Sequence, residues 1–473
     1  MQHTNVRYEG TSFTINSRLS FKLLIESWKE KIAEDKDGLR EFYGDLLESL
    51  SAYPEVLEPI NDLSILKDRQ PLIEKMMTSI FPVTLSDKKD LYAISIPFTY
   101  KTIYSSALFK SIFLNESGDM IMVPDPETER VISEQKIIMS YQMILTKFYG
   151  FELRGDTTTV HPFLDPVTGL QKYLQLELNS RFIEVKAKGK LPDLGQNQTC
   201  IRLKDLLKIP RLQVLLPLDL FEFEGFVIIN IKDVTEREVI SDIKNRLLTV
   251  HSFADIHAFA SLQEQMQKLI GLSDVRIGIA PFFKINNHYV FSDQFSQNSF
   301  ILKHIHSQEE KTRICLKLIQ LFQKHDDFLV ISSITPEVVR DYPFLRTILE
   351  EGGKSLIICP LRSGKELIGV LSFLSNTPGM LGYSHIQKIE PAIPLFVLAL
   401  EKSAEILNNQ IDRVIKEQFT AVQSSVEWKF TEAALSFLTK KSKGDDSKIE
   451  NIVFEDVYPL YGSNRYKEFI HRT

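Results

Sequence analysis

Residues 352–375 read GGKSLIICPLRSGKELIGVLSFLS and predict the centre of a β-sheet. Residues 355–361 and 366–374 are apolar runs, and the short polar segment between them contains Gly364. Two such runs separated by a glycine-containing turn predict an antiparallel hairpin. Both faces of each run are apolar, which is typical of central strands in a sheet that is covered on both sides.

The elements around this hairpin follow a set order. Residues 327–332 (DFLVIS) predict a short strand, residues 337–349 predict a helix, and a long helix follows Tyr383. Together with the hairpin, this order resembles a GAF domain, a small-molecule-sensing module of signalling proteins. The residues that carry the resemblance are Gly352, Ser355, Leu356, Pro360, Leu361, Gly364, Ile368, Gly369, Val370 and Leu371. The resemblance implies a fold, but it names no ligand, because one fold hosts many functions.

Composition excludes several classes of protein. A chain of 473 residues predicts about three domains. The net charge of −6 argues against a surface built for nucleic acid. The apolar runs are far shorter than the ~20 residues of a membrane span, and the polar N-terminus lacks a secretory signal. The 3 cysteines lie far apart, which fits a reducing cytosol. We therefore predict a cytoplasmic protein that binds neither nucleic acid nor membrane, and the resemblance to a GAF domain implies a bacterial source.

The first half of the chain predicts helices and then a mixed module. After a loose lead-in over residues 1–17, apolar residues at helical spacing predict helices within residues 21–32, 39–50 and 71–81. Residues 1–82 are therefore predicted to form a helical bundle or a helical cap on the adjoining module. Residues 83–235 predict an α+β module with a strand at 91–98, helices at 104–113 and 131–148, a hairpin at 173–186 and a buried strand at 225–231.

The end of this module has a second resemblance. Residues 225–231 (GFVIINI) run into Asp233-Val234-Thr235-Glu236-Arg237 and then into a predicted helix. A last apolar strand that ends in this way resembles the end of a PAS sensor domain, so residues 83–235 are interpreted as PAS-like. Residues 236–400 are then assigned to the GAF domain.

The long helix assigned to residues 401–441 begins with a heptad seam that spans three heptads: Leu400, Ala404, Leu407, Ile411, Val414, Gln418 and Ala421. Apolar residues spaced alternately four and three apart predict a seam for pairing with a second copy of the chain. The residues expected in this homodimer contact are Leu400, Leu407, Ile411 and Val414. The alternative is that the stripe packs against its own domain. Residues 442–473 are predicted to be a linker and the truncated start of a further segment, because little sequence comes after Gly462.

Motifs for catalysis or metal binding do not stand out. His304, His306 and Cys315 lack the further ligand that a zinc site would need, so no metal is predicted. Cys359 lies in the middle of a predicted strand and is interpreted as a small buried hydrophobic residue. The sequence has no nucleophile elbow, phosphate-binding glycine loop or zinc-protease motif. We therefore expect no enzyme, and the cofactors remain unknown.

A GAF domain binds its ligand between the sheet and the helices and loops over one of its faces. The residues predicted to line such a pocket are Phe283, Phe291, Ile334, Arg340, Phe344, Ile348, Ile358 and Phe373. Arg340 is the polar candidate for an anionic ligand, with a surface salt bridge as the alternative. The aliphatic residues have the alternative of a plain core role.

The sequence thus predicts an α+β fold: a helical N-terminal segment, a small PAS-like module, a GAF domain with a central antiparallel sheet, and a long C-terminal helix. The predicted function is a non-catalytic sensor that binds a small molecule or a partner. The alternatives are the regulatory half of a signalling enzyme whose output domain is missing, and a scaffold whose GAF pocket is filled by its own side chains.

Overall fold

A computed structural model gives the fold of the chain. The residues that it describes are 2–34, 38–99, 101–116, 118–121, 126–151, 158–192, 209–249, 256–285, 288–291, 296–324, 327–418, 427–442 and 452. The chain divides into an N-terminal unit of residues 1–163 and 173–234, and a C-terminal unit of residues 164–172 and 235–473. Apart from Ser442 and Ile452, the predicted segment 442–473 lies outside the described residues.

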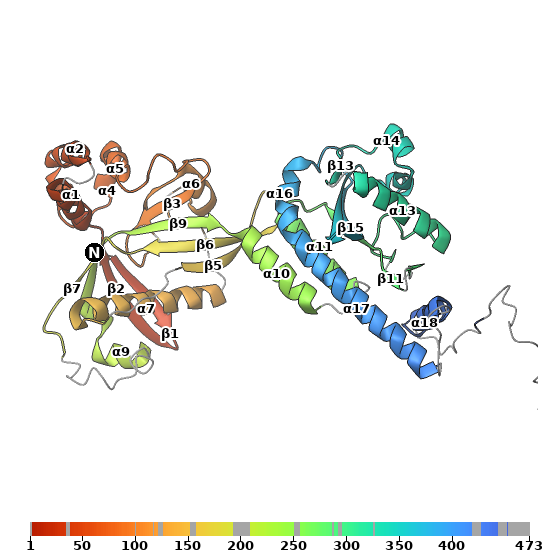
Figure 1. Ribbon diagram of the computed structural model, residues 1–473. Coiled ribbons are helices and arrows are strands. Elements are labelled where there is room, and N and C mark those ends of the chain that lie inside the picture. Colours follow the sequence, from red (N-terminus) through yellow and green to blue (C-terminus); the bar gives the residue numbers. More distant parts are fainter. Residues whose placement is uncertain are drawn as a thin grey trace, which may run out of the picture. The chain divides into compact units, whose positions relative to one another are not determined.

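The N-terminal unit combines helices with two sheets (Figure 1). Its elements in chain order are β1 (Gln2–Tyr8), β2 (Thr11–Arg18), α1 (Lys22–Glu34), α2 (Arg40–Ser51), α3 (Pro54–Leu57), α4 (Ser64–Asp68), α5 (Gln70–Met77), β3 (Leu91–Ser95), β4 (Thr102–Ser105), α6 (Ala107–Phe113), α7 (Pro126–Tyr149), β5 (Thr158–Leu164), β6 (Gln171–Asn179), β7 (Ile183–Ala187), α9 (Ile209–Leu215), the 3₁₀ turn η1 (Leu218–Leu220), β8 (Phe221–Gly225) and β9 (Val227–Asp233). The strand orders are β1-β2-β8-β7 and β4-β3-β9-β6-β5.

The C-terminal unit is built around an antiparallel sheet of order β10-β15-β14-β13. Its elements are α10 (Thr235–Thr249), α11 (Ile256–Ile270), β10 (Arg276–Pro281), β11 (Lys284–Ile285), β12 (His288–Tyr289), α13 (Gln308–Lys324), β13 (Leu329–Ile331), α14 (Pro336–Asp341), η2 (Pro343–Leu345), α15 (Arg346–Glu350), β14 (Ser355–Ser363), β15 (Glu366–Ser375), η3 (Tyr383–His385), α16 (Ile386–Ile389), η4 (Glu390–Ala392), α17 (Ile393–Gln418) and α18 (Glu427–Ser442).

The start of the chain is a β-hairpin, so the predicted loose lead-in over residues 1–17 is wrong. Strands β1 and β2 pair antiparallel around Glu9 and Gly10, whose positive φ angles of 45° and 80° fit a tight hairpin turn. The signal in the sequence is alternation on β2, where Phe13 and Ile15 point into the core while Ser12 and Thr14 do not.

The helices predicted within residues 21–81 form a layer of the N-terminal unit, whereas residues 2–8 and 11–18 of the predicted segment 1–82 are strands. Helices α1, α2 and α5 share one apolar core with Tyr92 and Ile94 of β3 and with Ile228 of β9. The other face of the five-stranded sheet contributes Ala93 and Ile229 to a second core, which contains residues of α6 and α7. Period-two alternation along β3 and β9 therefore gives this sheet two buried faces.

The predicted hairpin over residues 173–186 is wrong, because the two strands enter different sheets. Strand β6 pairs with β9, whereas β7 pairs with β8. Between Asn179 and Phe182 the chain bends but does not reverse its direction. It reverses later, so that β8 and β9 run antiparallel beside β7 and β6. The predicted strand 225–231 is likewise broken at Phe226 into β8 and β9. The result is one long antiparallel ribbon that is bent where it crosses from sheet to sheet.

The predicted hairpin of residues 352–375 is confirmed. Strands β14 and β15 pair antiparallel and lie in the interior of their sheet, with Gly364 in the turn at φ 59°. One sheet face meets α13 through a shared apolar core. The other face meets α17, which contacts β14 and β15, and α11, which contacts β10 (Figure 1). Coverage on both sides explains why both strands are continuously apolar.

The long helix predicted after Tyr383 is divided as its prolines suggest. Pro391 lies in the 3₁₀ turn η4 and Pro394 in the first turn of α17. The predicted seam residues Leu400, Leu407, Ile411 and Val414 are all buried within the single chain. Along the described part of the seam, the structure therefore matches the alternative, in which the stripe packs on its own unit; Ala421, at its end, lies outside the described residues.

The predicted α+β class is confirmed, with antiparallel sheets and a long C-terminal helix. Throughout the described ranges, no helix is both long and apolar enough to cross a membrane.

Candidate functional site

Most residues of the predicted pocket meet in one apolar layer of the C-terminal unit. This layer lies between the sheet and α13, and it includes side chains from β14, α15 and the loop before α14. The predicted residues that it contains are Phe291, Ile334, Ile348 and Ile358, all buried, and Phe344, which is partly buried. We name these residues, with the rest of that cluster, the α13 layer.

Phe373 does not belong to the α13 layer. In the antiparallel pairing of β14 and β15, Ile358 lies opposite Ser372, and Phe373 lies opposite Ile357. Residues directly opposite one another share a face, so Ile358 and Phe373 point to different sides of the sheet. Phe373 therefore faces the α11 and α17 side, and its inclusion among the pocket residues is wrong for a pocket on the α13 side.

Phe283 and Arg340 also lie apart from the α13 layer. Phe283 is buried, but its neighbour Phe282 is the residue that packs within the layer. The Arg340 side chain is 77% exposed on α14 and pairs with Glu337 at 3.7 Å. This is the surface salt bridge that the sequence left open as the alternative, and such pairs contribute about 0–1 kcal/mol.

Sequence reasoning missed Lys311 on α13. Its side chain is 1% exposed, and lysine is almost never fully buried unless it is paired. Lys311 precedes Cys315, Leu318 and Phe322 by four, seven and eleven residues, so it occupies the buried face of the helix. That register in the sequence could have identified it. Lys311 is therefore a buried polar residue on the face of α13 that packs against the layer, and it makes contacts within the chain.

Charged and aromatic groups meet at the β11–β12 hairpin, close to the same layer. The Lys284 ammonium lies 2.6 Å from a Glu366 carboxylate oxygen and 5.0 Å from the centre of the Tyr289 ring. Tyr289 in turn stacks on Phe291 with their ring centres 6.4 Å apart. This hairpin therefore connects a surface ion pair to a side chain of the α13 layer.

The residues considered for a metal site are not arranged as ligands. His304 hydrogen-bonds to Glu351, whereas Cys315 is buried in the α13 layer. Burial raises the pKa of the Cys315 thiol to about 12, so it stays protonated near neutral pH. Among the residues that the structure describes, no group of three or more His, Cys, Asp or Glu side chains could hold a metal ion.

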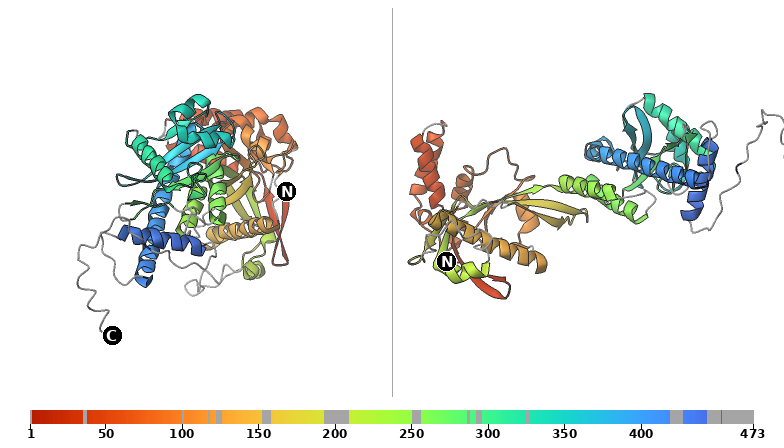
Figure 2. Two further views of the ribbon diagram at one scale, coloured as in Figure 1. Left: turned by 90° about the vertical axis from the view of Figure 1, so that its right-hand side faces the viewer. Right: turned by 60° about the horizontal axis from the view of Figure 1, so that its bottom comes forward.

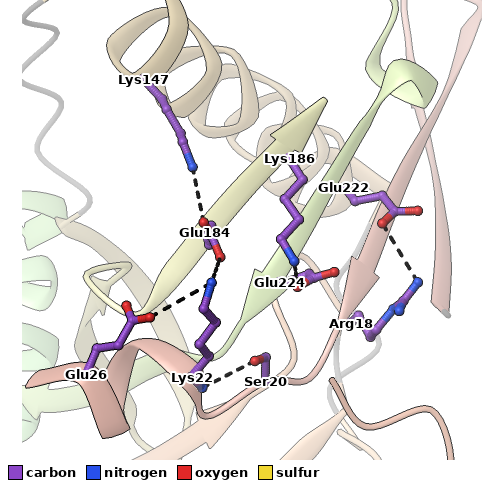
Figure 3. A network of polar contacts seen from close by, with 9 residues as sticks. All are labelled: Arg18, Ser20, Lys22, Glu26, Lys147, Glu184, Lys186, Glu222 and Glu224. Atoms are coloured by element: carbon purple, nitrogen blue, oxygen red, sulfur yellow. Dashed lines mark hydrogen bonds and ion pairs between the residues drawn. The ribbon is translucent and has the colours of Figure 1, made fainter. Parts of the chain in front are cut away.

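The N-terminal unit carries a charged face on its four-stranded sheet (Figure 3). Arg18, Glu224 and Glu184 lie in register on β2, β8 and β7, so their side chains share one face. Every carboxylate there has a cationic neighbour. The ion pairs are Lys186–Glu224 at 2.6 Å, Lys22–Glu184 at 3.4 Å, Lys147–Glu184 at 3.5 Å, Lys188–Glu222 at 3.5 Å and Arg18–Glu222 at 3.8 Å.

The electrostatics of the charged face favour a structural role. Burial raises the pKa of Glu184, but the ammonium groups of Lys22 and Lys147 more than offset this, and its pKa lies below the ordinary value. A general acid or base works best with a pKa near the operating pH, and this shift goes the other way. The Lys186–Glu224 and Arg18–Glu222 pairs link neighbouring strands, whereas Lys22 and Lys147 connect helices α1 and α7 to β7.

In comparisons with known proteins, no family model matches the chain, and no curated protein matches its sequence.

Proposed function

We propose that the C-terminal unit is a GAF-type regulatory module that responds to a small molecule held in the α13 layer and acts through helix α17. The proposal assigns no catalysis to the unit. The PAS-like interpretation of residues 83–235 is kept as part of the same proposal, with both modules belonging to a sensor. The order of strand, helix, β14–β15 hairpin and long helix supports this assignment.

The observation that carries the proposal is the two-sided position of the β14–β15 hairpin. Ile358 points into the α13 layer, whereas Ile357 and Phe373 point toward the side where α17 packs. Gly369 of β15 lies close to Leu400 of α17: a Cβ atom at Gly369 would be 2.9 Å from the Leu400 Cδ1 atom. Because packed interiors transmit small displacements, a change in the α13 layer reaches α17 through a single sheet.

Lys311 is the buried charged residue of α13, and a ligand would bind it by exchanging one of its contacts within the chain. The α13 layer is largely apolar but also contains buried Ser372 opposite Ile358, and ligand sites commonly combine apolar walls with a few buried polar groups. A buried ammonium group favours a ligand with a carboxylate, phosphate or carbonyl oxygen.

A scaffold is the second candidate. Phe322, Ile348 and Leu345 are among many layer residues with almost no exposure, so side chains of the chain itself fill much of this region. In that case the C-terminal unit would act as a rigid platform for a protein partner, and no small molecule would bind the layer.

Thermal unfolding of the full chain with a panel of nucleotides, amino acids, short carboxylic acids and aromatic heterocycles separates these candidates. A ligand at about 100 times its Kd adds about 2.7 kcal/mol of stability, which raises Tm by roughly 5 °C or more. No rise with any compound class would favour the scaffold.

Neighbouring residues of β14 provide a matched control. Ile357→Val and Ile358→Val each remove one buried methylene, at a cost of about 0.5–1.5 kcal/mol. Ile358→Val also alters a wall of the α13 layer, so it is expected to change ligand affinity by roughly tenfold. Ile357→Val changes the opposite face and leaves that affinity unaltered. An equal effect of both variants would contradict a site in the α13 layer.

A further inference from the structure

Helix α17 continues beyond the elements that cover its first half. Close to residue 402, the Glu401 carboxylate accepts a hydrogen bond from Ser363, the last residue of β14. Lys402 donates to the carbonyl oxygen of Leu248, near the end of α10, at 2.7 Å. Gln418 lies 16 residues further on, which corresponds to about 24 Å of helix. The second half of α17 therefore needs a different cover.

Helix α18 provides that cover. Leu407, Ile411 and Val414 are only 5%, 1% and 6% exposed, although they lie beyond the ends of β14 and α10. Among described elements, α18 contacts α17 extensively, and both views of Figure 2 place it across this end of α17. The residues of α18 that become fully buried are Thr431 and Ala434.

The residues of α18 that are fully buried are small, whereas its large apolar side chains are only partly buried. Thr431 and Ala434 are small residues, and burial of apolar surface is what drives such packing. The large apolar side chains of α18 are only partly used: Trp428 is 36% exposed, and Phe437 is partly exposed. Phe430, Leu435 and Leu438 are likewise only partly buried, so α18 leaves part of its apolar surface exposed.

The face under α18 has the pattern of a helix-pairing seam. Leu400, Ala404, Leu407, Ile411 and Val414 follow a regular alternation of four and three residues, with Ile411 and Leu407 at successive a and d positions. A β-branched residue at a and leucine at d favour two parallel strands. In a parallel pair, Ser403 would lie near Asn408 of the second copy, so no like charges oppose the contact at that position.

We propose that α18 is a reversible cover on the second half of α17, and that the face it covers binds the same face of a second copy of this chain. The covered state is monomeric, and release of α18 exposes the seam and allows a parallel dimer. In this proposal, the homodimer predicted from the heptad pattern forms only after α18 has been released from α17. This inference rests on the proposed function, in which α17 is the output helix, and adds how that output is controlled.

The test is the mass in solution of the full chain, measured by light scattering after size exclusion. Ala434→Asp puts a carboxylate into the contact with α17 and is expected to convert a monomer into a dimer. The control Lys441→Asp places the same group at an exposed position of α18 and should leave the monomer. Ala434→Asp combined with Leu407→Asp should return the chain to a monomer, because the second carboxylate disrupts the seam.

The exchange of backbone amides measures release of α18 independently of mass. Within residues 403–418, exchange should rise in dilute Ala434→Asp protein and fall again as concentration drives dimerisation. Should α18 stay docked, Thr431→Asp is added to Ala434→Asp. An uncovered seam that remains monomeric overturns the proposal, as does a wild-type dimer that Leu407→Asp fails to dissociate. The rise of Tm with ligand is measured on the same variants. A rise without dimer formation contradicts only the covering role of α18, whereas the absence of a rise contradicts the proposed function.

Discussion

The backbone N–H of Phe226 donates a hydrogen bond to the carbonyl oxygen of Phe182 across 3.2 Å, at the bend where the ribbon passes between two sheets. The two rings stack with centres 5.0 Å apart. Gly225, which directly precedes Phe226, adopts φ 141°. A Cβ atom at Gly225 would lie 1.8 Å from the carbonyl oxygen of Phe182. The bend thus requires a residue without a side chain at position 225.

Gly225→Ala is therefore expected to be strongly destabilising. The methyl group would overlap the Phe182 backbone, which has no flexible end to move, and the backbone would be strained as well; the combined loss should be about 3 kcal/mol or more. Urea unfolding measures it. The control is Gly44→Ala inside α2, where a Cβ meets nothing within 4 Å, and a gain of about 0.5–1 kcal/mol is expected. Similar effects of both changes would contradict this description of the bend.

Asp165 should make stability depend on acid. The Lys172 ammonium lies 2.7 Å from its carboxylate, and this interaction, with a hydrogen bond from the Val167 amide, lowers its pKa to about 2. A lowered folded pKa stabilises the chain above the unfolded value near 4, and that contribution is lost as the pH falls toward 2.

Asp165→Asn should reduce the free energy of unfolding by about 1–2 kcal/mol at pH 7, because the side chain is charged only in the wild type. The variant and the wild type should converge between about pH 4 and pH 2. Urea unfolding across this range tests the prediction, and a difference that stays constant with pH would count against it. Asp45→Asn, at an exposed position of α2, serves as the comparison for loss of a carboxylate.

Both described cysteines should resist alkylation in the native chain. Burial raises the pKa of Cys315 to about 12 and that of Cys359 well above its ordinary value, so almost no thiolate exists near pH 8. Mass spectrometry of peptides after iodoacetamide treatment should show neither residue modified until urea is added. Rapid labelling of Cys359 without urea would mean that the β14–β15 hairpin opens readily.

Ser106→Ala should weaken the start of α6. The Ser106 hydroxyl accepts a hydrogen bond from the Phe109 N–H at 3.1 Å and donates one to the Asp90 carbonyl oxygen at 2.7 Å, so its removal should cost about 1 kcal/mol or more. Ser111→Ala on the same helix is the matched control, because Ser111 is exposed and donates only to a carbonyl within the helix. Urea unfolding that finds equal losses for both variants would show that the cap contributes nothing.

Local patterns predicted much of the fold. The β14–β15 hairpin, the N-terminal helices and the division of the last helix at Pro391 all arise from periodicity and turn chemistry. Pairings between distant segments were not predictable in this way: the bend at Phe182 and Gly225 resembles a turn and then a strand when only neighbouring residues are considered. The seam of α17 shows the same limit, because a heptad pattern cannot distinguish α18 from a second copy as the partner.

The candidate site was predictable only in part. Ile334, Ile348 and Ile358 meet as expected, because strand and helix faces set their directions. Phe373 was misplaced by one step of the strand period, which moves a side chain to the opposite face. Lys311 was missed since a lysine on an amphipathic helix is ordinarily solvated, and its burial depends on the segments that pack over α13.

Native mass spectrometry of the freshly purified full chain, before and after denaturation, addresses the sensor proposal in one step. We expect a monomer whose mass exceeds the 54.5 kDa of the chain by that of a small molecule, which denaturation releases. A chain that shows its sequence mass alone in both states would contradict a ligand in the α13 layer and favour the scaffold.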